Sequence, residues 1–241
     1  LESVNKDKLN YILNHHEDFQ LGKSWVNGKL VDGQAQLTLL AGYHDALNHK
    51  GETCIKYRQK GYNFGRYYGD RNLQLQNISR RIRHTIANDG MIDVDIKNAH
   101  PVLLSWYCKT HSIPCEGLNY YIDNRDACLK TLLEMKGLTK DQAKQDILAI
   151  TNGRDKYEEQ VEGYPEWYLN YYLNMKAIIE AVQIAEPEYK KSAEKSKKAN
   201  GKEGFNVGGT TINYLMTDLE NRCLMCMYDV ALENDVRVGS L

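Results

Sequence analysis

Met91-Ile92-Asp93-Val94-Asp95 is the stretch that decides the fold of this chain, because apolar and acidic residues alternate along it. Such alternation predicts a short strand, on which side chains repeat every second residue, so Asp93 and Asp95 share one face. The two carboxylates can hold one cation between them, or one can be a ligand while the other is structural. Both can also be merely solvated. Pro101 then suits the first turn of a helix over residues 102–108.

A second stretch, Lys140-Asp141-Gln142-Ala143-Lys144, indicates a helix with two lysines one turn apart. Thr139 is its expected N-cap, and Asn152-Gly153 is typical of a helix C-terminus. Two lysines at this spacing repel each other unless an anion lies between them. They therefore indicate either an anion site, such as one for a triphosphate, or a solvated helix face. The same helix has an expected apolar stripe, made of Ala143, Ile147 and Ile150.

The rest of the chain predicts a mostly helical α+β fold. Residues 1–60 read as helical pieces broken by glycines, and short strand-like stretches follow over residues 54–66. Tyr164-Pro165 begins another helix that runs to about residue 184. Apolar repeats predict a last helix over residues 212–232, followed by the start of a strand at residues 236–238.

Local charge is more informative than the net charge of −1, which gives no global attraction to nucleic acid. A run of lysines with small polar neighbours over residues 190–202 predicts a mobile basic loop. Such a loop either follows a phosphate backbone, with an affinity that falls as salt rises, or is a solvated linker.

Composition limits the other function classes. No apolar run is long enough to span a bilayer and the first residues are polar, so we expect no membrane association and a soluble intracellular protein, cytoplasmic or nucleoid-associated. The 17 Tyr against three Phe are expected to serve in packing, although tyrosines also stack on bases. Six cysteines fit a reducing compartment, and Cys223 with Cys226 reads as buried core thiols or as part of a zinc site.

The residues around the acidic strand resemble the family A DNA polymerases, which include the bacterial repair polymerase and its phage relatives. Gly65-Arg66, Leu75-Gln76-Asn77-Ile78 and Arg81-Ile82-Arg83 are similar to that family's Thr-Gly-Arg, Leu-Gln-Asn-Ile-Pro and Arg-x-Arg run. Asp95 falls on the aspartate of motif A. His100 stands where motif A has its glutamate.

The lysine helix resembles motif B of the same family, Arg-x-x-Ala-Lys-x-x-x-Phe-Gly-x-x-Tyr-Gly. The Arg, Lys, Phe and Tyr of that motif correspond to Lys140, Lys144, Leu148 and Asn152.

Two later segments continue the resemblance, which covers residues from about 54 to the end of the sequence. Tyr164-Pro165 is similar to the Tyr-Pro that follows the fingers helix. Asn213 and Asp218 stand where the family has a Gln and an Asp on its late palm helix.

The resemblance implies a right-handed polymerase palm and fingers, with a small antiparallel palm sheet. Residues 1–60 would be a reduced thumb-like region, 61–110 the palm with motif A, 111–185 the fingers with motif B, and 186–241 a continuation of the palm. We expect no proofreading exonuclease, because the family places that domain ahead of the thumb and only about fifty residues precede the match.

The implied reaction joins a nucleoside triphosphate to a primer 3′-hydroxyl by a mechanism that uses two Mg²⁺ ions, or Mn²⁺ in their place. Asp95 and the backbone carbonyl of Ile96 would bind metal. Lys144 would meet the triphosphate and protonate the leaving pyrophosphate, and Lys140 would hold the β and γ phosphates. The substrate would also meet His100, Leu148 and Asn152. Primed template DNA, or an RNA–DNA hybrid, would meet Arg66, Gln76, Asn77, Arg81, Arg83 and Asn213.

Departures from the family pattern leave several functions open. His100 in place of the glutamate puts the preference for deoxynucleotides in doubt, and Leu148 and Asn152 replace an aromatic pair that stacks on the incoming base. The family's second metal-binding Asp lies beyond Leu241, so the sequence represents a shortened chain, part of a longer one, or an incomplete enzyme.

The leading hypothesis is a template-directed nucleotidyltransferase. The alternatives are a primase-like or RNA-synthesising polymerase, a non-catalytic primer-template binding module, and a metal nuclease built on Asp93, Asp95 and His100.

Overall fold

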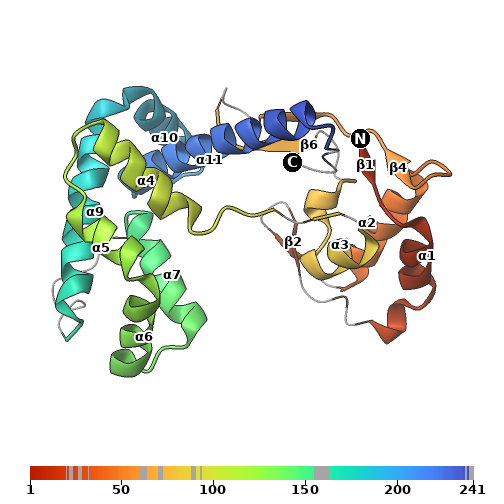
Figure 1. Ribbon diagram of the computed structural model, residues 1–241, viewed down its shortest axis with the longest axis horizontal. Coiled ribbons are helices and arrows are strands. Elements are labelled where there is room, and N and C mark those ends of the chain that lie inside the picture. Colours follow the sequence, from red (N-terminus) through yellow and green to blue (C-terminus); the bar gives the residue numbers. More distant parts are fainter. Residues whose placement is uncertain are drawn as a thin grey trace. The chain divides into compact units, whose positions relative to one another are not determined.

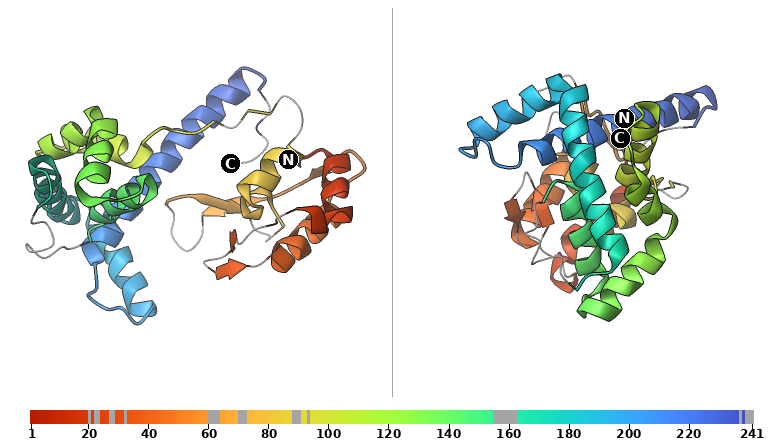
Figure 2. Two further views of the ribbon diagram at one scale, coloured as in Figure 1. Left: turned by 90° about the horizontal axis from the view of Figure 1, so that it is seen from below. Right: turned by 90° about the vertical axis from the view of Figure 1, so that its left-hand side faces the viewer.

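The computed structural model describes two compact units, shown in Figures 1 and 2. Unit 1 comprises Leu1–Asp95 and Cys223–Leu241, and unit 2 comprises Ile96–Arg222. The residues described are 1–19, 21, 24–26, 29–31, 33–59, 64–69, 73–87, 91–92, 94–154, 163–236 and 238. They are mostly helical with small antiparallel sheets, which confirms the α+β class. The division into thumb-like, palm and fingers regions stays a prediction, because compactness alone does not assign those roles.

The described residues of unit 1 combine short strands with three complete helices and the last part of a fourth. Its elements are β1 (Glu2–Ser3), α1 (Lys6–Asn14), a 3-10 turn (His16–Asp18), β2 (Ser24–Val26), β3 (Lys29–Val31), α2 (Gly33–Asp45), β4 (Glu52–Thr53), β5 (Tyr57–Gln59), β6 (Tyr67–Gly69), a second 3-10 turn (Leu75–Asn77) and α3 (Arg80–Ile86). The strands pair antiparallel as β1 with β4, β2 with β3, and β5 with β6. Apolar side chains from the three helices form one core, which includes Leu9, Leu40 and Ile86.

A buried carboxylate ties the elements of unit 1 together. Glu2 is only 1% exposed. Its Oε2 accepts hydrogen bonds from the Tyr43 hydroxyl at 3.0 Å and from the Leu75 backbone N–H at 3.0 Å, and its Oε1 accepts one from the Tyr57 hydroxyl at 2.6 Å. A buried charge is tolerated only when its lone pairs are satisfied in this way. Burial and the charge of Glu2 both raise the pKa of Tyr43.

Unit 2 is built of helices. They are α4 (Ala99–Thr110), α5 (Glu116–Asp123), α6 (Arg125–Lys136), α7 (Lys140–Thr151), α9 (Glu166–Ala185), α10 (Pro187–Ala199) and α11 (Val207–Glu233). The part of α11 up to Arg222 belongs to unit 2, and the part from Cys223 belongs to unit 1. The predicted helices after Pro101, Thr139 and Tyr164-Pro165 are confirmed, and the last helix begins earlier than predicted, at Val207.

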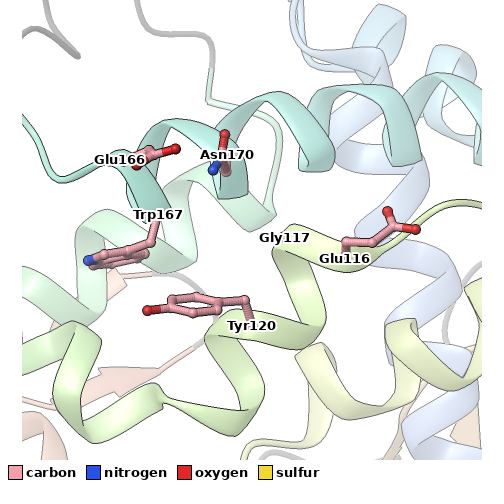
Figure 3. Close-up of a pocket in the computed structure, with 6 residues that line it drawn as sticks. All are labelled: Glu116, Gly117, Tyr120, Glu166, Trp167 and Asn170. Carbon is pink, nitrogen blue, oxygen red and sulfur yellow. The ribbon is translucent and has the colours of Figure 1, made fainter.

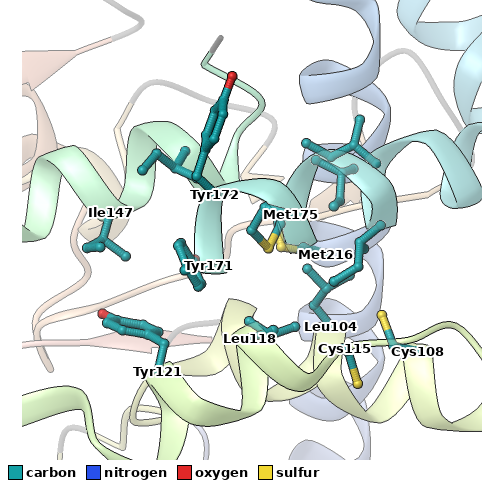
Figure 4. Packing of buried hydrophobic residues seen from close by; sticks show 14 of the residues in the cluster. Leu104, Cys108, Cys115, Leu118, Tyr121, Ile147, Tyr171, Tyr172, Met175 and Met216 are labelled. Carbon is teal, nitrogen blue, oxygen red and sulfur yellow. The ribbon is translucent and has the colours of Figure 1, made fainter. Parts of the chain in front are cut away.

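The core of unit 2 surrounds α9, which buries Tyr171, Met175 and Ile178 against α5, α7 and α11 (Figure 4). Gly117 on α5 permits a close contact with α9, because a Cβ at that position would lie 2.7 Å from the backbone oxygen of Asn170. Apolar burial of this kind stabilises a core by about 25 cal/mol per Å².

Buried tyrosines in this core form hydrogen bonds through their hydroxyls. Tyr171 and Thr151 share a hydrogen bond of 2.6 Å, Tyr107 donates to Glu186 Oε1 at 2.8 Å, and Tyr168 donates to Asp146. Phenylalanine offers the same ring without the polar end. The prediction that most tyrosines serve in packing is consistent with these contacts, and they explain why Tyr rather than Phe occupies the core.

The strand predicted over residues 91–95 is wrong for its described residues. Met91, Ile92, Val94 and Asp95 form no strand, and Asp93 lies outside the described residues. None of the described strands pairs with this segment, so its backbone has no ladder to join. Ile92 and Val94 are accordingly 85% and 66% exposed. The strand start predicted at 236–238 is also wrong for Val236 and Val238, which form no strand.

The basic loop predicted over residues 190–202 is wrong as well. Most of it is helix α10, which has Pro187 in its first turn. Lysine, alanine and glutamate are good helix formers, and proline in the first turn costs no hydrogen bond. Gly201, with a φ of +66°, follows the helix end. Composition therefore suggested mobility where local propensity makes a helix.

Two further predictions concern the cysteines and the membrane. Cys226 is exposed, so the interpretation of both cysteines of the Cys-x-x-Cys pair as buried core thiols is wrong. In the described part of the chain, no group of three or more His, Cys, Asp or Glu side chains could hold a metal ion. No helix among the described residues has both the length and the apolar character needed to cross a membrane.

Replacing Glu2 tests whether the buried carboxylate organises unit 1. We expect Glu2→Gln to lower the free energy of opening of unit 1 by about 3 kcal/mol, because an amide cannot accept all three hydrogen bonds. Hydrogen exchange of peptides from residues 1–87 measures this loss. Glu17→Gln, at an exposed position, is the control and should change exchange little. Equal protection in both variants would contradict the role of Glu2.

Thiol labelling tests the core of unit 2, which contains Cys108 and Cys128. Burial raises the pKa of Cys108 to about 12 and that of Cys128 to about 11. At pH near 8, mass spectrometry should therefore find Cys54 and Cys226 labelled rapidly, and Cys108 and Cys128 only in denaturant. Because their folded-state pKa values are raised, these thiols stabilise the fold below the ordinary thiol pKa of about 8.5, and that contribution falls as pH rises toward the raised values. Labelling of Cys108 as fast as Cys54 would contradict this arrangement.

Candidate functional site

Helix α7 presents the predicted cationic residues on its outer side. Thr139 caps it through a capping box with Gln142, and Ala143, Ile147 and Ile150 are buried as expected. An adjacent, more exposed surface carries the residues that we call the α7 face: Lys140, Lys144 and Leu148. Leu148 is 42% exposed. The apolar stripe therefore holds the helix in the core, and the two ammonium groups remain accessible to an anion.

The lysines of the α7 face are weakly paired. Lys144 Nζ lies 3.7 Å from Asp141 Oδ1, three residues earlier on the same helix, and both side chains are substantially exposed. Exposed pairs of this kind contribute about 0–1 kcal/mol. No ion pair within the described residues involves Lys140. A polyanionic ligand could therefore replace the Asp141 contact at little cost.

The end of α7 meets the start of α11 through three asparagines, which we call the Asn junction: Asn152, Asn206 and Asn213. The Asn213 amide donates to Asn152 Oδ1 at 3.3 Å, and the Asn206 amide donates to the Asn152 backbone oxygen at 3.1 Å. Asn206 Oδ1 in turn accepts from the backbone N–H of Gly209 at 3.0 Å. Two residues predicted to contact substrate and nucleic acid, Asn152 and Asn213, are thus brought together.

Glycines make this junction possible. A Cβ on Gly209 would lie 2.0 Å from the Asn152 backbone oxygen, and a Cβ on Gly153 would lie 2.8 Å from the Gly209 Cα. Gly153 also has a φ of +72°, a backbone conformation that residues with a side chain rarely adopt. The two backbones therefore touch at a point where no other residue type fits without movement.

His100 forms a contact that the sequence did not predict. Its Nε2 lies 3.4 Å from Glu220 Oε2, and both side chains are mostly buried. The contact joins the first turn of α4 to α11. A protonated His100 would make an ion pair with Glu220, whereas a neutral His100 can donate a hydrogen bond only from the tautomer with hydrogen on Nε2.

Asp218, two residues before Glu220, is a buried anchor. Its Oδ2 accepts a hydrogen bond from the Tyr189 hydroxyl at 2.8 Å and pairs with the Arg222 guanidinium at 2.7 Å. Burial, together with the bond to Asp218, raises the pKa of Tyr189 above the ordinary tyrosine value. Asp218 therefore fixes the start of α10 against α11.

The predicted metal ligands are consecutive in the sequence, where the chain passes from unit 1 to unit 2. Asp95 is the last residue of unit 1 and is exposed, and Ile96 is the first residue of unit 2. Both are in irregular backbone before α4. Asp93, the predicted supporting carboxylate, lies outside the described residues. The described donors are therefore one carboxylate and one backbone carbonyl.

The predicted nucleic-acid contacts other than Asn213 belong to unit 1. Arg66 and Arg81 are exposed. Gln76 donates to the Tyr67 backbone oxygen at 3.3 Å, and Arg83 donates to the Leu75 backbone oxygen at 3.5 Å. Gln76 and Arg83 therefore have structural partners in addition to any role in binding.

A separate hollow of about 580 Å³ lies between α5 and α9 (Figure 3). Its lining is Glu116, Gly117, Tyr120, Glu166, Trp167 and Asn170. The two carboxylates would repel a phosphate. This hollow therefore does not suit a nucleotide, and it contains none of the predicted site residues.

Sequence reasoning missed Glu220, Asn206 and the glycine contact. Only the glycines left a signal, because Gly208-Gly209 near a helix start is unfavourable for the helix and indicates close approach of another segment. Glu220 resembles any polar residue on a helix. Its partner, His100, is 120 positions away in the sequence, and no local sequence pattern indicates a contact over that separation.

Comparison with known proteins gives one relative. A protein described as "Putative helicase V13", from Sputnik virophage, is 30% identical over 181 residues, which cover 73% of this chain. The chain spans 23% of that relative's length. No family model matches the chain, and no solved structure matches it significantly.

A pair of glycine substitutions tests the Asn junction. Gly153 and Gly137 both follow a helix with positive φ, but a Cβ on Gly137 would meet nothing within 4 Å. We expect Gly137→Ala to cost about 1 kcal/mol of backbone strain, and Gly153→Ala to cost about 1–3 kcal/mol more because its Cβ meets Gly209. Urea unfolding followed by circular dichroism measures both values. Equal costs would contradict the close contact.

Proposed function

We propose that this chain is a template-directed nucleotidyltransferase with a palm and fingers like those of family A DNA polymerases. The observation that carries the proposal is the hydrogen bond between Asn152 and Asn213, which are 61 positions apart. They stand at the motif B tyrosine and the late palm glutamine of the family, which would share one substrate site. The exposed α7 face adds support, because it leaves Lys140 and Lys144 free to meet phosphates.

In the proposed reaction, the primer 3′-oxygen forms a bond with the α-phosphorus of the incoming nucleotide, the bond to the bridging oxygen breaks, and pyrophosphate leaves. Lys144 gives up its contact with Asp141, neutralises the triphosphate and donates a proton to the pyrophosphate oxygen. Lys140 holds the β and γ phosphates as a point charge. The hydroxyl proton passes to solvent. Arg66, Arg81 and Asn213 contact the primer and template.

The described donors fit Mg²⁺ that arrives with the nucleotide. Mg²⁺ keeps several waters and is usually held by one or two carboxylates together with substrate phosphates. The exposed Asp95 carboxylate and the Ile96 carbonyl are hard oxygen donors of this kind. When bound, the ions would neutralise charge on the transferring phosphate and favour ionisation of the 3′-hydroxyl.

His100 supports a second version of the reaction, in which ribonucleotides are used. In the family, the motif A glutamate helps to exclude the 2′-hydroxyl of a ribose. Here His100 stands in place of that glutamate, and its Nε2 lies 3.4 Å from Glu220 Oε2 of α11. Primase-like or RNA synthesis is therefore the alternative to DNA synthesis.

The relative's name supports a nucleic-acid enzyme but not a helicase motor in this chain. A motor of that type usually binds its nucleotide with a Gly-x-x-x-x-Gly-Lys-Ser/Thr loop. The 241 residues contain no such loop. A module that binds primed template without chemistry is the remaining alternative, because the cations of the α7 face suit binding of phosphates as well as catalysis.

Primer extension on a defined template tests the proposal. We expect extension in Mg²⁺ to be abolished by Asp95→Asn and to fall about 100-fold or more in Lys144→Gln. Asp126→Asn and Lys130→Gln change exposed residues on α6 and should leave extension unaltered. Parallel reactions with ribonucleotides and deoxynucleotides decide between RNA and DNA synthesis.

Two outcomes would contradict this function. Extension that persists in Asp95→Asn would exclude Asp95 as the metal ligand. Salt-dependent binding of primed template by the unaltered protein, without extension in Mg²⁺ or Mn²⁺, would identify a binding module instead.

A further inference from the structure

The loop between α10 and α11 has a defined shape. Figure 1 shows α10 beside the beginning of α11. The backbone N–H groups of Gly201 and Lys202 donate to the oxygens of Lys198 and Lys197 at 3.1 and 2.9 Å. Gly201, Gly204 and Asn206 all have positive φ, so the chain turns tightly between the helices. The loop is therefore a fixed platform for the side chains that it carries.

Helix α10 carries a row of exposed cations, which we call the lysine row: Lys191, Lys195 and Lys198. Steps of four and three place these lysines on one side, while Ala193 is buried on the other and Tyr189 is anchored to Asp218. No ion pair within the described residues joins the lysine row to a carboxylate. Like charges at this spacing destabilise a helix, so the row has a cost that a bound polyanion would remove.

The row has the dimensions of a nucleic-acid backbone contact. Seven residues of helix span about 10 Å, over which one strand in duplex geometry carries about three phosphates, and an extended strand fewer. Lys202 extends the positive charge into the loop. Glu188 and Glu194 flank the row, but α10 as a whole has five lysines against two glutamates.

An exposed aromatic ring lies in the loop that follows α10. Phe205 is 68% exposed, and phenylalanine is rare in this chain. Exposure of its apolar ring to water does not stabilise the fold. Its backbone N–H donates to the Lys202 oxygen at 3.1 Å, and Lys197 Nζ lies 5.4 Å from the centre of its ring. The loop thus presents a flat apolar surface beside several cations.

We infer that the hairpin of α10 and α11 is a binding surface for single-stranded nucleic acid, with the lysine row along the backbone and a base stacked on Phe205. Cations that follow a backbone, with an aromatic ring for stacking, are the combination that single strands require. The phosphates of a duplex would bind the lysines, but a duplex offers no unstacked base to Phe205. The inference rests on the proposed function only in that both need nucleic acid as partner, and a template strand ahead of the primer end is the expected occupant.

Binding of an oligonucleotide of deoxythymidines and of a blunt duplex, without Mg²⁺ or nucleoside triphosphates, tests the inference. Replacing the three lysines of the row by Gln should reduce the slope of log K against log salt for the single strand by about 2. Phe205→Ala should weaken single-strand binding about tenfold or more without changing the slope or duplex binding, and Phe205→Tyr should restore it.

A charge-matched control replaces Lys50, Lys109 and Lys130, which are exposed on separate elements, by Gln and should leave the slope unchanged. Removal of the row relieves repulsion, so urea unfolding should show no loss of stability in that variant. Equal slopes in the row variant and the control, or unchanged single-strand affinity in Phe205→Ala, would overturn the inference. So would dependence on the row for binding phosphatidylserine vesicles but not the oligonucleotide. Because chemistry is absent from the assay, failure of primer extension would not affect the result.

Discussion

The contact of the α7 backbone with the α11 backbone is the constraint on which the candidate site in unit 2 depends. Gly209 must lack a side chain because the carbonyl of Asn152 occupies the place of a Cβ. Once the two backbones touch, later positions of α11 meet other helices in turn. Asn213 meets the end of α7, Asp218 meets α10, and Glu220 meets α4. One helix thereby holds Asn152, the hairpin of α10 and α11, and His100.

Elements with both a helix-capping residue and a periodic pattern of apolar residues could be predicted from the sequence. Helix α7 follows from Thr139, its buried stripe and Gly153, because each of these features acts within a few residues. The segment 91–95 has the alternation of a strand, but strands also need a partner, and alternation does not supply one. For α10, a lysine-rich composition suggested mobility, and helix propensity decided the outcome. Local signals were therefore sufficient only where the stabilising contacts are local.

The sequence nominates residues for the candidate site but not their contacts. Order along the chain nominates Asn152, Asn213 and His100 by resemblance alone, and their roles stay predictions. The hydrogen bonds that join them to each other or to Glu220 depend on tertiary packing, which sequence spacing does not encode. The tyrosine-rich composition is a related case. It indicated packing, but only the structure shows that Tyr107, Tyr168 and Tyr171 each bring a hydroxyl to a partner.

The bonds of Glu2 have a consequence for the order in which the protein forms during synthesis. They connect Glu2 to Tyr43, Tyr57 and Leu75, at separations of 41, 55 and 73 positions. Contacts of such long range form late, and Leu75, which supplies the last of the three donors, leaves the ribosome well after Glu2. Until then Glu2 carries an unsatisfied charge that keeps the residues around it in water. Unit 1 can close only after most of its sequence has emerged.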